Sequence, residues 1–155
     1  MVSSPGRRII IISRLLLVFI IMFFLFFNFA GGVAEARSYK FLKLVITAEI
    51  LEDGSMVVAE ERTTAFEGVY TGLYQWIYKD PGVEIVDVSV AENGIFYEFN
   101  PGTTYGPAGT YYITAEPGRF YVDWSFEAGN EVRTFTLRYR ILNAVQVHND
   151  VAELY

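Results

Sequence analysis

The chain has 155 residues, a formal net charge of −6 and no cysteine. This length predicts one domain, or one domain preceded by a targeting segment. The absence of cysteine excludes a disulfide framework and thiol chemistry, so the domain must be held together by its core alone.

An apolar run occupies the N-terminal region. From Leu15 to Ala30 every residue is apolar except Asn28. Small residues follow, and the segment before the run contains three arginines, Arg7, Arg8 and Arg14. This order predicts a signal peptide over residues 1–36, with Ala34 and Ala36 in the cleavage box and a mature chain that begins at Arg37.

An uncleaved membrane anchor is the alternative to a signal peptide. The apolar stretch reaches back through Ile9–Ile12 and approaches the roughly 20 residues that a spanning helix requires. Both alternatives keep the basic residues on the cytoplasmic side, so residues 37–155 are expected to face outward.

Residues 37–155 are acidic. They contain 9 basic and 17 acidic residues, which gives a net charge near −8. A domain of this charge, without a basic cluster, repels phosphate backbones and anionic lipid headgroups. Nucleic acid is therefore excluded as an expected partner, and the membrane is expected to be contacted through the N-terminal segment.

The first strands follow the predicted signal. Residues 39–51 alternate, and the predicted apolar face consists of Leu42, Leu44, Ile46, Ala48 and Ile50. Asp53-Gly54 then predicts a tight turn, and Met56–Phe66 a second strand that completes a hairpin.

The same alternation of strand and turn continues to Leu142. Turns are predicted at Asp80-Pro81-Gly82, Asn93-Gly94, Glu116-Pro117-Gly118 and Glu127–Asn130, where proline or glycine suits the backbone angles. The predicted strands are Val83–Val90, Ile95–Phe99, Thr110–Ala115, Phe120–Phe126 and Val132–Leu142. In the last of these the odd-numbered residues form the aromatic and aliphatic face. Asn100 to Gly109 is expected to be irregular.

Seven or eight short strands separated by turn signals are typical of an all-β fold. We expect an antiparallel β-sandwich of immunoglobulin-like type over residues 37–155, with a partly open barrel as the alternative. This domain follows the predicted signal peptide.

No catalytic motif or phosphate-binding loop is recognisable, and no cofactor or metal site is expected. His148 is the only histidine and is expected to lie in a polar loop after the last strand. The carboxylates are interpreted as solvated surface charge, against the alternatives of a hydrolase pair or a calcium site. These carboxylates are Glu52, Asp53, Glu60, Glu61, Asp123, Glu127 and Glu131.

Aromatic residues gather around residue 76. Tyr74, Trp76 and Tyr78 share parity and would therefore stand on one face of a strand. Such a face can stack on sugars or bind a protein partner, whereas cross-strand packing is the alternative. We treat these three residues as the candidate partner-binding face.

The order of several segments resembles the YciQ-like predicted membrane proteins, a family whose N-terminal domain has no known function. The resemblance rests on Glu52–Glu60, Phe66-Glu67-Gly68, Gly72–Ile77, Tyr139–Val145 and Asp150–Tyr155. Gln75 stands where the family often has arginine. Family resemblance implies a signal, an outward β-domain, and further sequence with membrane-spanning helices after this domain.

The expected function is that of an extracytoplasmic interaction or structural module of a bacterial membrane protein, without enzymatic activity. A carbohydrate-binding or calcium-binding adhesin-like domain is the alternative, followed by an envelope hydrolase. The expected partner is a protein or a polysaccharide.

Overall fold

The computed structural model describes residues 16–20, 22–23, 37–148 and 151–154. The chain divides into two units, residues 1–35 and 36–155, and each is described by itself. Residues 16–20 and 22–23 are helical. Within the described parts of the chain, no helix combines the length and apolar character needed to cross a membrane. Most of the predicted signal peptide, including its cleavage box, lies outside the described residues.

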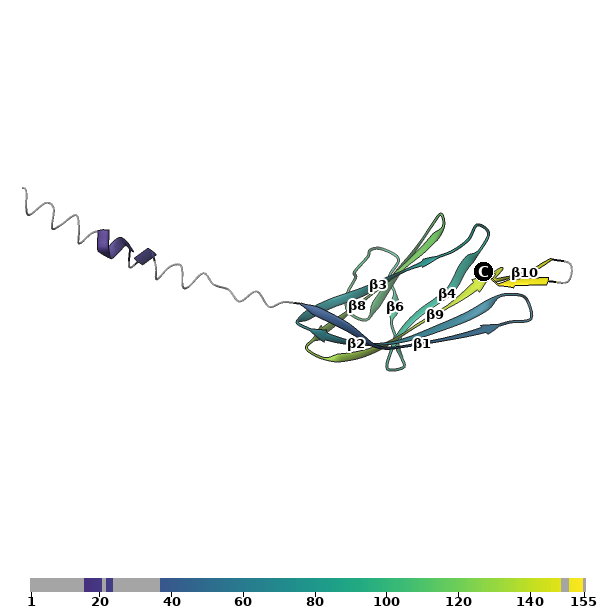
Figure 1. Cartoon of the computed structure of the whole chain (residues 1–155), viewed down its shortest axis with the longest axis horizontal. Helices are drawn as coiled ribbons and strands as arrows, with labels where there is room; N and C mark the ends of the chain where they lie inside the picture. The colour runs from purple at the N-terminus through teal and green to yellow at the C-terminus, as the bar shows by residue number, and fades with distance from the viewer. Residues whose placement is uncertain (1–15, 21, 24–36, 149–150, 155) are drawn as a thin grey trace, which may run out of the picture. The chain divides into compact units, whose positions relative to one another are not determined.

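The second unit contains two β-sheets packed as a sandwich (Figure 1). The larger sheet has five strands in the order β1-β2-β9-β4-β5, and all of its pairs are antiparallel. Its strands are β1 (Ser38–Ile50), β2 (Met56–Glu67), β4 (Glu84–Glu92), β5 (Ile95–Phe96) and β9 (Val132–Leu142). We call it the five-stranded sheet.

The second sheet has four strands in the order β3-β8-β7-β6. Its strands are β3 (Val69–Tyr78), β6 (Glu98–Phe99), β7 (Thr110–Glu116) and β8 (Arg119–Gly129). We call it the four-stranded sheet. A separate hairpin is formed by β10 (Val145–His148) and β11 (Val151–Leu154).

The core lies between the two sheets because strand alternation turns one face of each sheet inward. On β9 the odd-numbered Phe135, Leu137 and Tyr139 are buried, which confirms the predicted face of that strand. Trp124 and Phe126 on β8 meet Phe135, with ring centroids 5.9 and 4.7 Å apart. Large aromatic side chains of this kind bury more apolar area per residue than aliphatic ones.

Most turns follow the local sequence signals, but the predicted turn Glu127–Asn130 begins too early, because residues 127–129 still belong to β8. Asn93 and Gly94 both have positive φ, at 50° and 83°, as a two-residue type I′ hairpin requires. The predicted first hairpin is also confirmed. Its turn is closed by the Gly54 N–H, which donates to the Leu51 carbonyl at 3.0 Å, and Gly54 itself is left-handed at φ 77°.

Several strand predictions need correction. The described residues contain eleven strands, more than the seven or eight expected. The predicted strand Ile95–Phe99 is two short strands, β5 and β6, which join different sheets. Because β6 pairs with β7 in parallel, the four-stranded sheet is mixed and not purely antiparallel. The two-sheet sandwich is confirmed, and its immunoglobulin-like relationship stays a prediction.

The C-terminal prediction also differs from the structure. His148 ends strand β10, whereas a loop was expected, and β10 pairs with β11. The Val145 N–H donates to the Gly54 carbonyl at 3.0 Å, so this hairpin begins beside the turn between β1 and β2. Asn149 and Asp150 lie outside the described residues.

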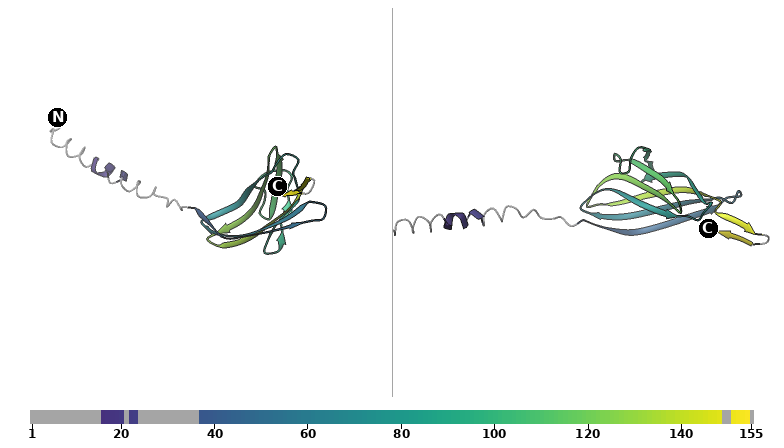
Figure 2. Two further views of the ribbon diagram at one scale, coloured as in Figure 1. Left: turned by 45° about the vertical axis from the view of Figure 1, so that its right-hand side comes forward. Right: turned by 90° about the horizontal axis from the view of Figure 1, so that it is seen from above.

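Strand β1 is the edge of the five-stranded sheet and is exposed along its whole length (Figure 2). A bulge between Phe41 and Lys43 changes the parity of the strand. The inward side therefore carries Phe41 together with Leu44, and the predicted continuous face from Leu42 is wrong at its first residue. The inward-facing residues are Tyr39, Phe41, Leu44, Ile46, Ala48 and Ile50.

Candidate functional site

The three aromatic residues of β3 lie on the outer face of the four-stranded sheet. Tyr74, Trp76 and Tyr78 are paired with Asp123, Tyr121 and Arg119 of β8. The intervening β8 residues Val122 and Trp124 face the core. Since alternate residues occupy opposite faces, the three aromatic side chains point away from the core. The shared face is confirmed.

Trp76 is held in place by two neighbours on this surface. Its ring centroid lies 4.7 Å from that of Tyr121, and the Arg119 guanidinium lies 4.1 Å from the indole centroid. Arg119 is itself paired with Glu116 at 2.6 Å. The two flanking side chains are more open, since Tyr74 is 56% and Tyr78 is 79% exposed. Trp76 is therefore an anchored ring between two accessible ones.

The segment 100–109 covers the next part of the same outer face. Tyr105 donates its backbone N–H to Asp123 Oδ1 at 3.0 Å. Gly72 allows this approach, because a Cβ atom there would lie 3.0 Å from Tyr105 Cδ1 and from the Trp124 carbonyl oxygen. This irregular segment, confirmed as such, buries outer-face residues that would otherwise meet solvent.

Asp123 is the most buried carboxylate of this region, with 1% of its surface exposed. Burial raises the pKa of Asp123, while the hydrogen bonds from the Tyr105 backbone and the Tyr121 side chain act in the opposite direction. Burial also raises the pKa of Tyr121. The prediction that Asp123 is solvated surface charge is wrong, because segment 100–109 covers it.

A second polar cluster lies between the sheets. Glu60 on β2 accepts hydrogen bonds from Arg62 at 3.0 Å, from Tyr139 at 2.8 Å and from Gln75 at 3.1 Å. Arg62 also donates to Gln75 Oε1 at 2.6 Å. Burial, together with the nearby Glu60 charge, raises the pKa of Tyr139. We call these four residues the inter-sheet cluster.

The inter-sheet cluster corrects a second carboxylate prediction. Glu60 is 5% exposed and its charge is balanced by Arg62, so it is not surface charge. A sequence signal for this burial exists. Glu60 and Arg62 occupy the same parity as Met56, Val58 and Phe66, which is the apolar face of β2. Charged residues at core parity indicate a buried pair.

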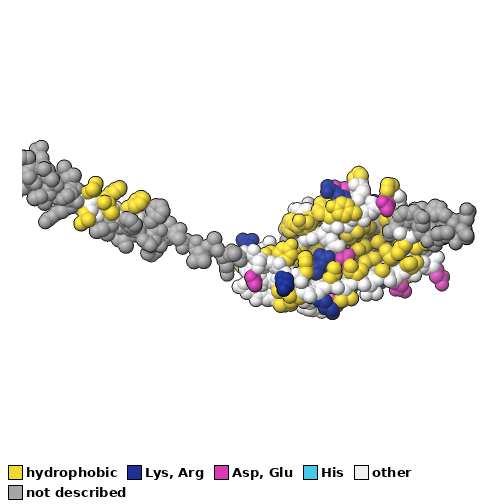
Figure 3. Space-filling view, viewed as in Figure 1, with side chains coloured by type: hydrophobic (Ala, Val, Ile, Leu, Met, Phe, Trp, Pro, Cys, Tyr) yellow, Lys and Arg dark blue, Asp and Glu magenta, His cyan; other side chains and the backbone are white. Residues whose placement is uncertain are grey.

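A groove runs along the edge of β3, beside the inter-sheet cluster. It has a volume of about 410 Å³ and lies between β1, β2, β3 and segment 100–109. Figure 3 shows hydrophobic side chains along this side of the domain, interrupted by basic and acidic side chains. The groove is lined by Tyr39, Phe41, Arg62, Tyr70, Gly72, Leu73, Tyr74 and Tyr105. Tyr74 thus belongs to both the groove and the aromatic face.

The groove is lined mainly by aromatic side chains. The one cation among its lining residues, Arg62, forms an ion pair with Glu60. Arg62 lies 5.3 Å above the centroid of Phe41 and shares its charge with Glu60. Tyr39 packs edge-on against Tyr70, with centroids 5.8 Å apart. A lining of this kind offers flat rings and hydroxyl groups without a free charge, which suits a neutral ligand.

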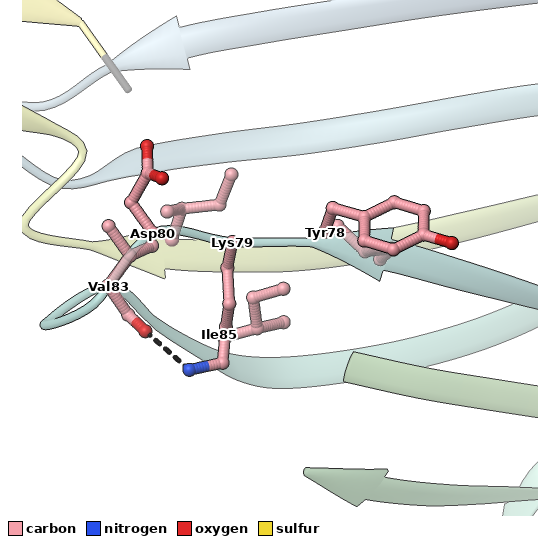
Figure 4. Close-up of a pocket in the computed structure, with 7 residues that line it drawn as sticks. Tyr78, Lys79, Asp80, Val83 and Ile85 are labelled. Carbon is pink, nitrogen blue, oxygen red and sulfur yellow. Dashed lines mark hydrogen bonds between the residues drawn. The ribbon is translucent and has the colours of Figure 1, made fainter. Parts of the chain in front are cut away.

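A smaller cavity at the turn between β3 and β4 is less suited to a ligand (Figure 4). Its volume is about 70 Å³. Lys79 donates its Nζ to the Val83 carbonyl at 2.9 Å across this turn, so the cation is used within the fold. Ligand pockets usually have several hundred Å³, so this cavity is not a candidate site.

The other predicted polar residues are dispersed. Asp53 bonds Ser55 and pairs with Arg140, and these contacts lower the pKa of Asp53. Glu131 pairs with Arg133 at 2.9 Å. Across the described residues, no three histidine, cysteine or acidic side chains gather to hold a metal ion. The side chain of His148 lies outside what the structure describes.

The comparisons with known proteins place the chain in a family. No curated protein and no solved structure matches it. A family model described as the N-terminal domain of a predicted membrane protein, DUF2207, matches residues 41–155. This match covers most of the sequence and the whole of the sandwich after its first residues, in agreement with the resemblance noted above. The chain therefore belongs to this family of predicted membrane proteins of unknown function.

Proposed function

We propose that residues 37–155 form an extracytoplasmic binding module that holds a neutral polysaccharide chain of the bacterial cell envelope. The single observation that carries this proposal is the accessibility of Tyr74 and Tyr78 on either side of the anchored Trp76. Flat amphipathic rings that stay exposed supply contact area at a low cost in conformational entropy.

The groove supports the same ligand class. Tyr74 leads from the aromatic face into it, so one extended chain can lie across both. The pairing of Arg62 with Glu60 leaves the groove without a free charge for an anionic or cationic polymer. The net charge near −8 of residues 37–155 also disfavours an acidic polysaccharide.

We also propose that the domain lies on the outer side of the membrane and that it binds its ligand without catalysis. The arginines before the apolar run support an outward-facing domain. Glu60 and Asp123 are enclosed by protein groups, and Asp53 and Glu131 are engaged with arginines. We propose binding and not turnover because none of these carboxylates faces another across the groove.

The test is a binding assay with purified residues 37–155 and neutral envelope polysaccharides, read by retardation in a gel that contains the polymer. Tyr74→Ala and Tyr78→Ala should each weaken binding, by roughly 1 to 3 kcal/mol for a stacking ring. Phe96→Ala is the matched control, because Phe96 is an exposed aromatic residue of the other sheet. Equal retardation of all three variants would contradict the proposal.

A further inference from the structure

A second surface lies on β1, after the bulge that separates it from Tyr39 and Phe41 of the groove. This strand has 13 residues, forms the edge of the five-stranded sheet and contains neither proline nor glycine. Its inward-facing Leu44, Ile46 and Ile50 are 51%, 58% and 56% exposed. A long apolar edge strand is a template for pairing with another strand, and natural proteins usually protect such an edge.

The hydrogen-bonding groups of β1 fix which residues a new strand would meet. At the hairpin, Leu51 donates its N–H to the Ser55 carbonyl at 2.8 Å, so Leu51 bonds toward β2. In an antiparallel ladder the residues alternate between bonding to one neighbour and to the other. The even-numbered Leu44, Ile46 and Ala48 therefore direct their N–H and C=O groups to the open edge.

Charge and shape indicate what pairs there. We consider a second β1 that runs antiparallel to the first, with the two Ile46 residues opposite each other. Leu44 of each chain then lies opposite Ala48 of the other. The Ile46 pair and the two Leu44–Ala48 pairs are all hydrogen-bonded pairs. The same register sets Lys43 opposite Glu49 twice, once on each side of the twofold axis. These two pairs fall at positions that are not hydrogen-bonded, where facing side chains are closest.

Neighbouring registers lose this match. A shift that sets Ile46 opposite Ala48 places Lys43 opposite Leu51, and a shift that sets Ile46 opposite Leu44 places Lys43 opposite Thr47. A shift by a single residue would put bonding groups opposite non-bonding ones. Only the register centred on Ile46 satisfies both the charges and the backbone.

We propose that β1 pairs with β1 of a second copy of this chain, centred on Ile46, and joins the two five-stranded sheets into one continuous sheet. The interface is isologous, as expected for a symmetric dimer. The bulge between Phe41 and Lys43 ends the paired segment on one side. The aromatic face is on the other sheet and takes no part in this contact.

Single cysteines in the full 155-residue chain, held in a mild detergent, test the register. The natural chain has no cysteine, so Ile46→Cys supplies the only thiol. Its two Cα atoms would lie about 5.5 Å apart, within reach of a disulfide. Under mild oxidation Ile46→Cys should form disulfide-linked dimers. The matched control Val45→Cys should not, because Val45 of one chain lies opposite Thr47 of the other and the two introduced thiols do not meet.

Charge reversal tests the pairing of Lys43 with Glu49. Lys43→Glu alone and Glu49→Lys alone place like charges opposite each other, so each should dimerise about tenfold more weakly. A mixture of the two variants restores opposite charges at both positions and should dimerise as well as the natural chain. The mixture also separates this contact from any association of the N-terminal apolar segment, which both variants retain.

Four results would overturn the proposal. Ile46→Cys could fail to link, Val45→Cys could link equally well, or the mixture could dimerise no better than either variant alone. Linking by Tyr78→Cys in place of Ile46→Cys would assign the association to β3 and also overturn it.

Discussion

Gln75 on β3 donates its Nε2 to both carboxylate oxygens of Glu60 on β2, at 3.1 Å each. These residues belong to different sheets, so the contact joins the two layers of the sandwich through a polar cluster. Tyr139 and Arg62 complete the hydrogen bonding of the same carboxylate. A buried charge is tolerated here because Arg62 of the same strand balances it and Gln75 and Tyr139 of two other strands complete its hydrogen bonds.

The first prediction concerns this cluster. Glu60→Gln keeps the shape of the side chain but removes the charge that balances Arg62, and it turns an amide donor toward Gln75. We expect a loss of about 3 kcal/mol in the free energy of unfolding, as for other broken buried pairs. Urea unfolding of residues 37–155 measures this loss.

The control for Glu60→Gln is its neighbour Glu61→Gln. Glu61 is solvent-exposed and pairs with Lys43 at 3.4 Å. Removal of this surface pair should change the free energy of unfolding by less than about 1 kcal/mol. If both substitutions have the same effect, the inter-sheet cluster does not stabilise the sandwich.

The second prediction separates the aromatic face from the core. Trp76→Ala removes a half-buried ring on the outer surface and should cost less than 3 kcal/mol, whereas Trp124→Ala should cost about 3 to 5 kcal/mol. The difference arises because Trp124 is enclosed by both sheets, whereas Trp76 lies on the outer face against Tyr121 and Arg119. Equal losses in thermal or urea unfolding would place Trp76 in the core.

The third prediction uses the pKa of Asp123, which burial raises above the ordinary value of 3.8. The folded state then binds a proton more tightly than the unfolded state. The protonation of Asp123 therefore stabilises the fold at low pH, and this contribution is lost as pH rises from about 4 through the raised pKa. Asp123→Asn removes this titration, so its stability relative to the natural chain should improve as pH rises.

The measurement for Asp123 is the difference in melting temperature between Asp123→Asn and the natural sequence across the acidic range. A difference is needed because Asp53 and Glu131 have lowered pKa values and act in the opposite direction. Asp53 and Glu131 are unchanged in the variant, so their pH-dependent contributions cancel in the difference. A difference that does not vary with pH would show that Asp123 titrates normally.

The fourth prediction tests how segment 100–109 packs against Gly72 of β3. Gly72→Ala would set a Cβ atom 3.0 Å from both the Tyr105 ring and the Trp124 carbonyl oxygen, so the segment must shift. We expect a loss of about 1 to 3 kcal/mol, as for other overpacked sites. Gly129→Ala is the control, because a Cβ atom there meets nothing within 4 Å. Urea unfolding measures the free energy of unfolding of both variants, and equal values for the two would contradict the prediction.

Features that depend on a few neighbouring residues can be predicted from the sequence. The buried face of β9 follows from the alternation of polar and apolar residues from Thr134 to Ile141, and the hairpin at Asn93-Gly94 follows from the positive φ that these residues tolerate. The shared face of Tyr74, Trp76 and Tyr78 follows from parity in the same way. These features are local because backbone angles and the period of a strand are local.

Which of the two faces of a strand is covered depends on how the sheets and loops pack. Parity places Trp76 and Trp124 on definite faces, but it does not say which face meets the other sheet. Asp123 is buried because segment 100–109 folds over it, and Glu60 is buried because β3 and β9 bring Gln75 and Tyr139 to it. These contacts join residues far apart in sequence, so no local pattern contains them. The open edge of β1 has the same origin, since it follows from the order in which the strands assemble.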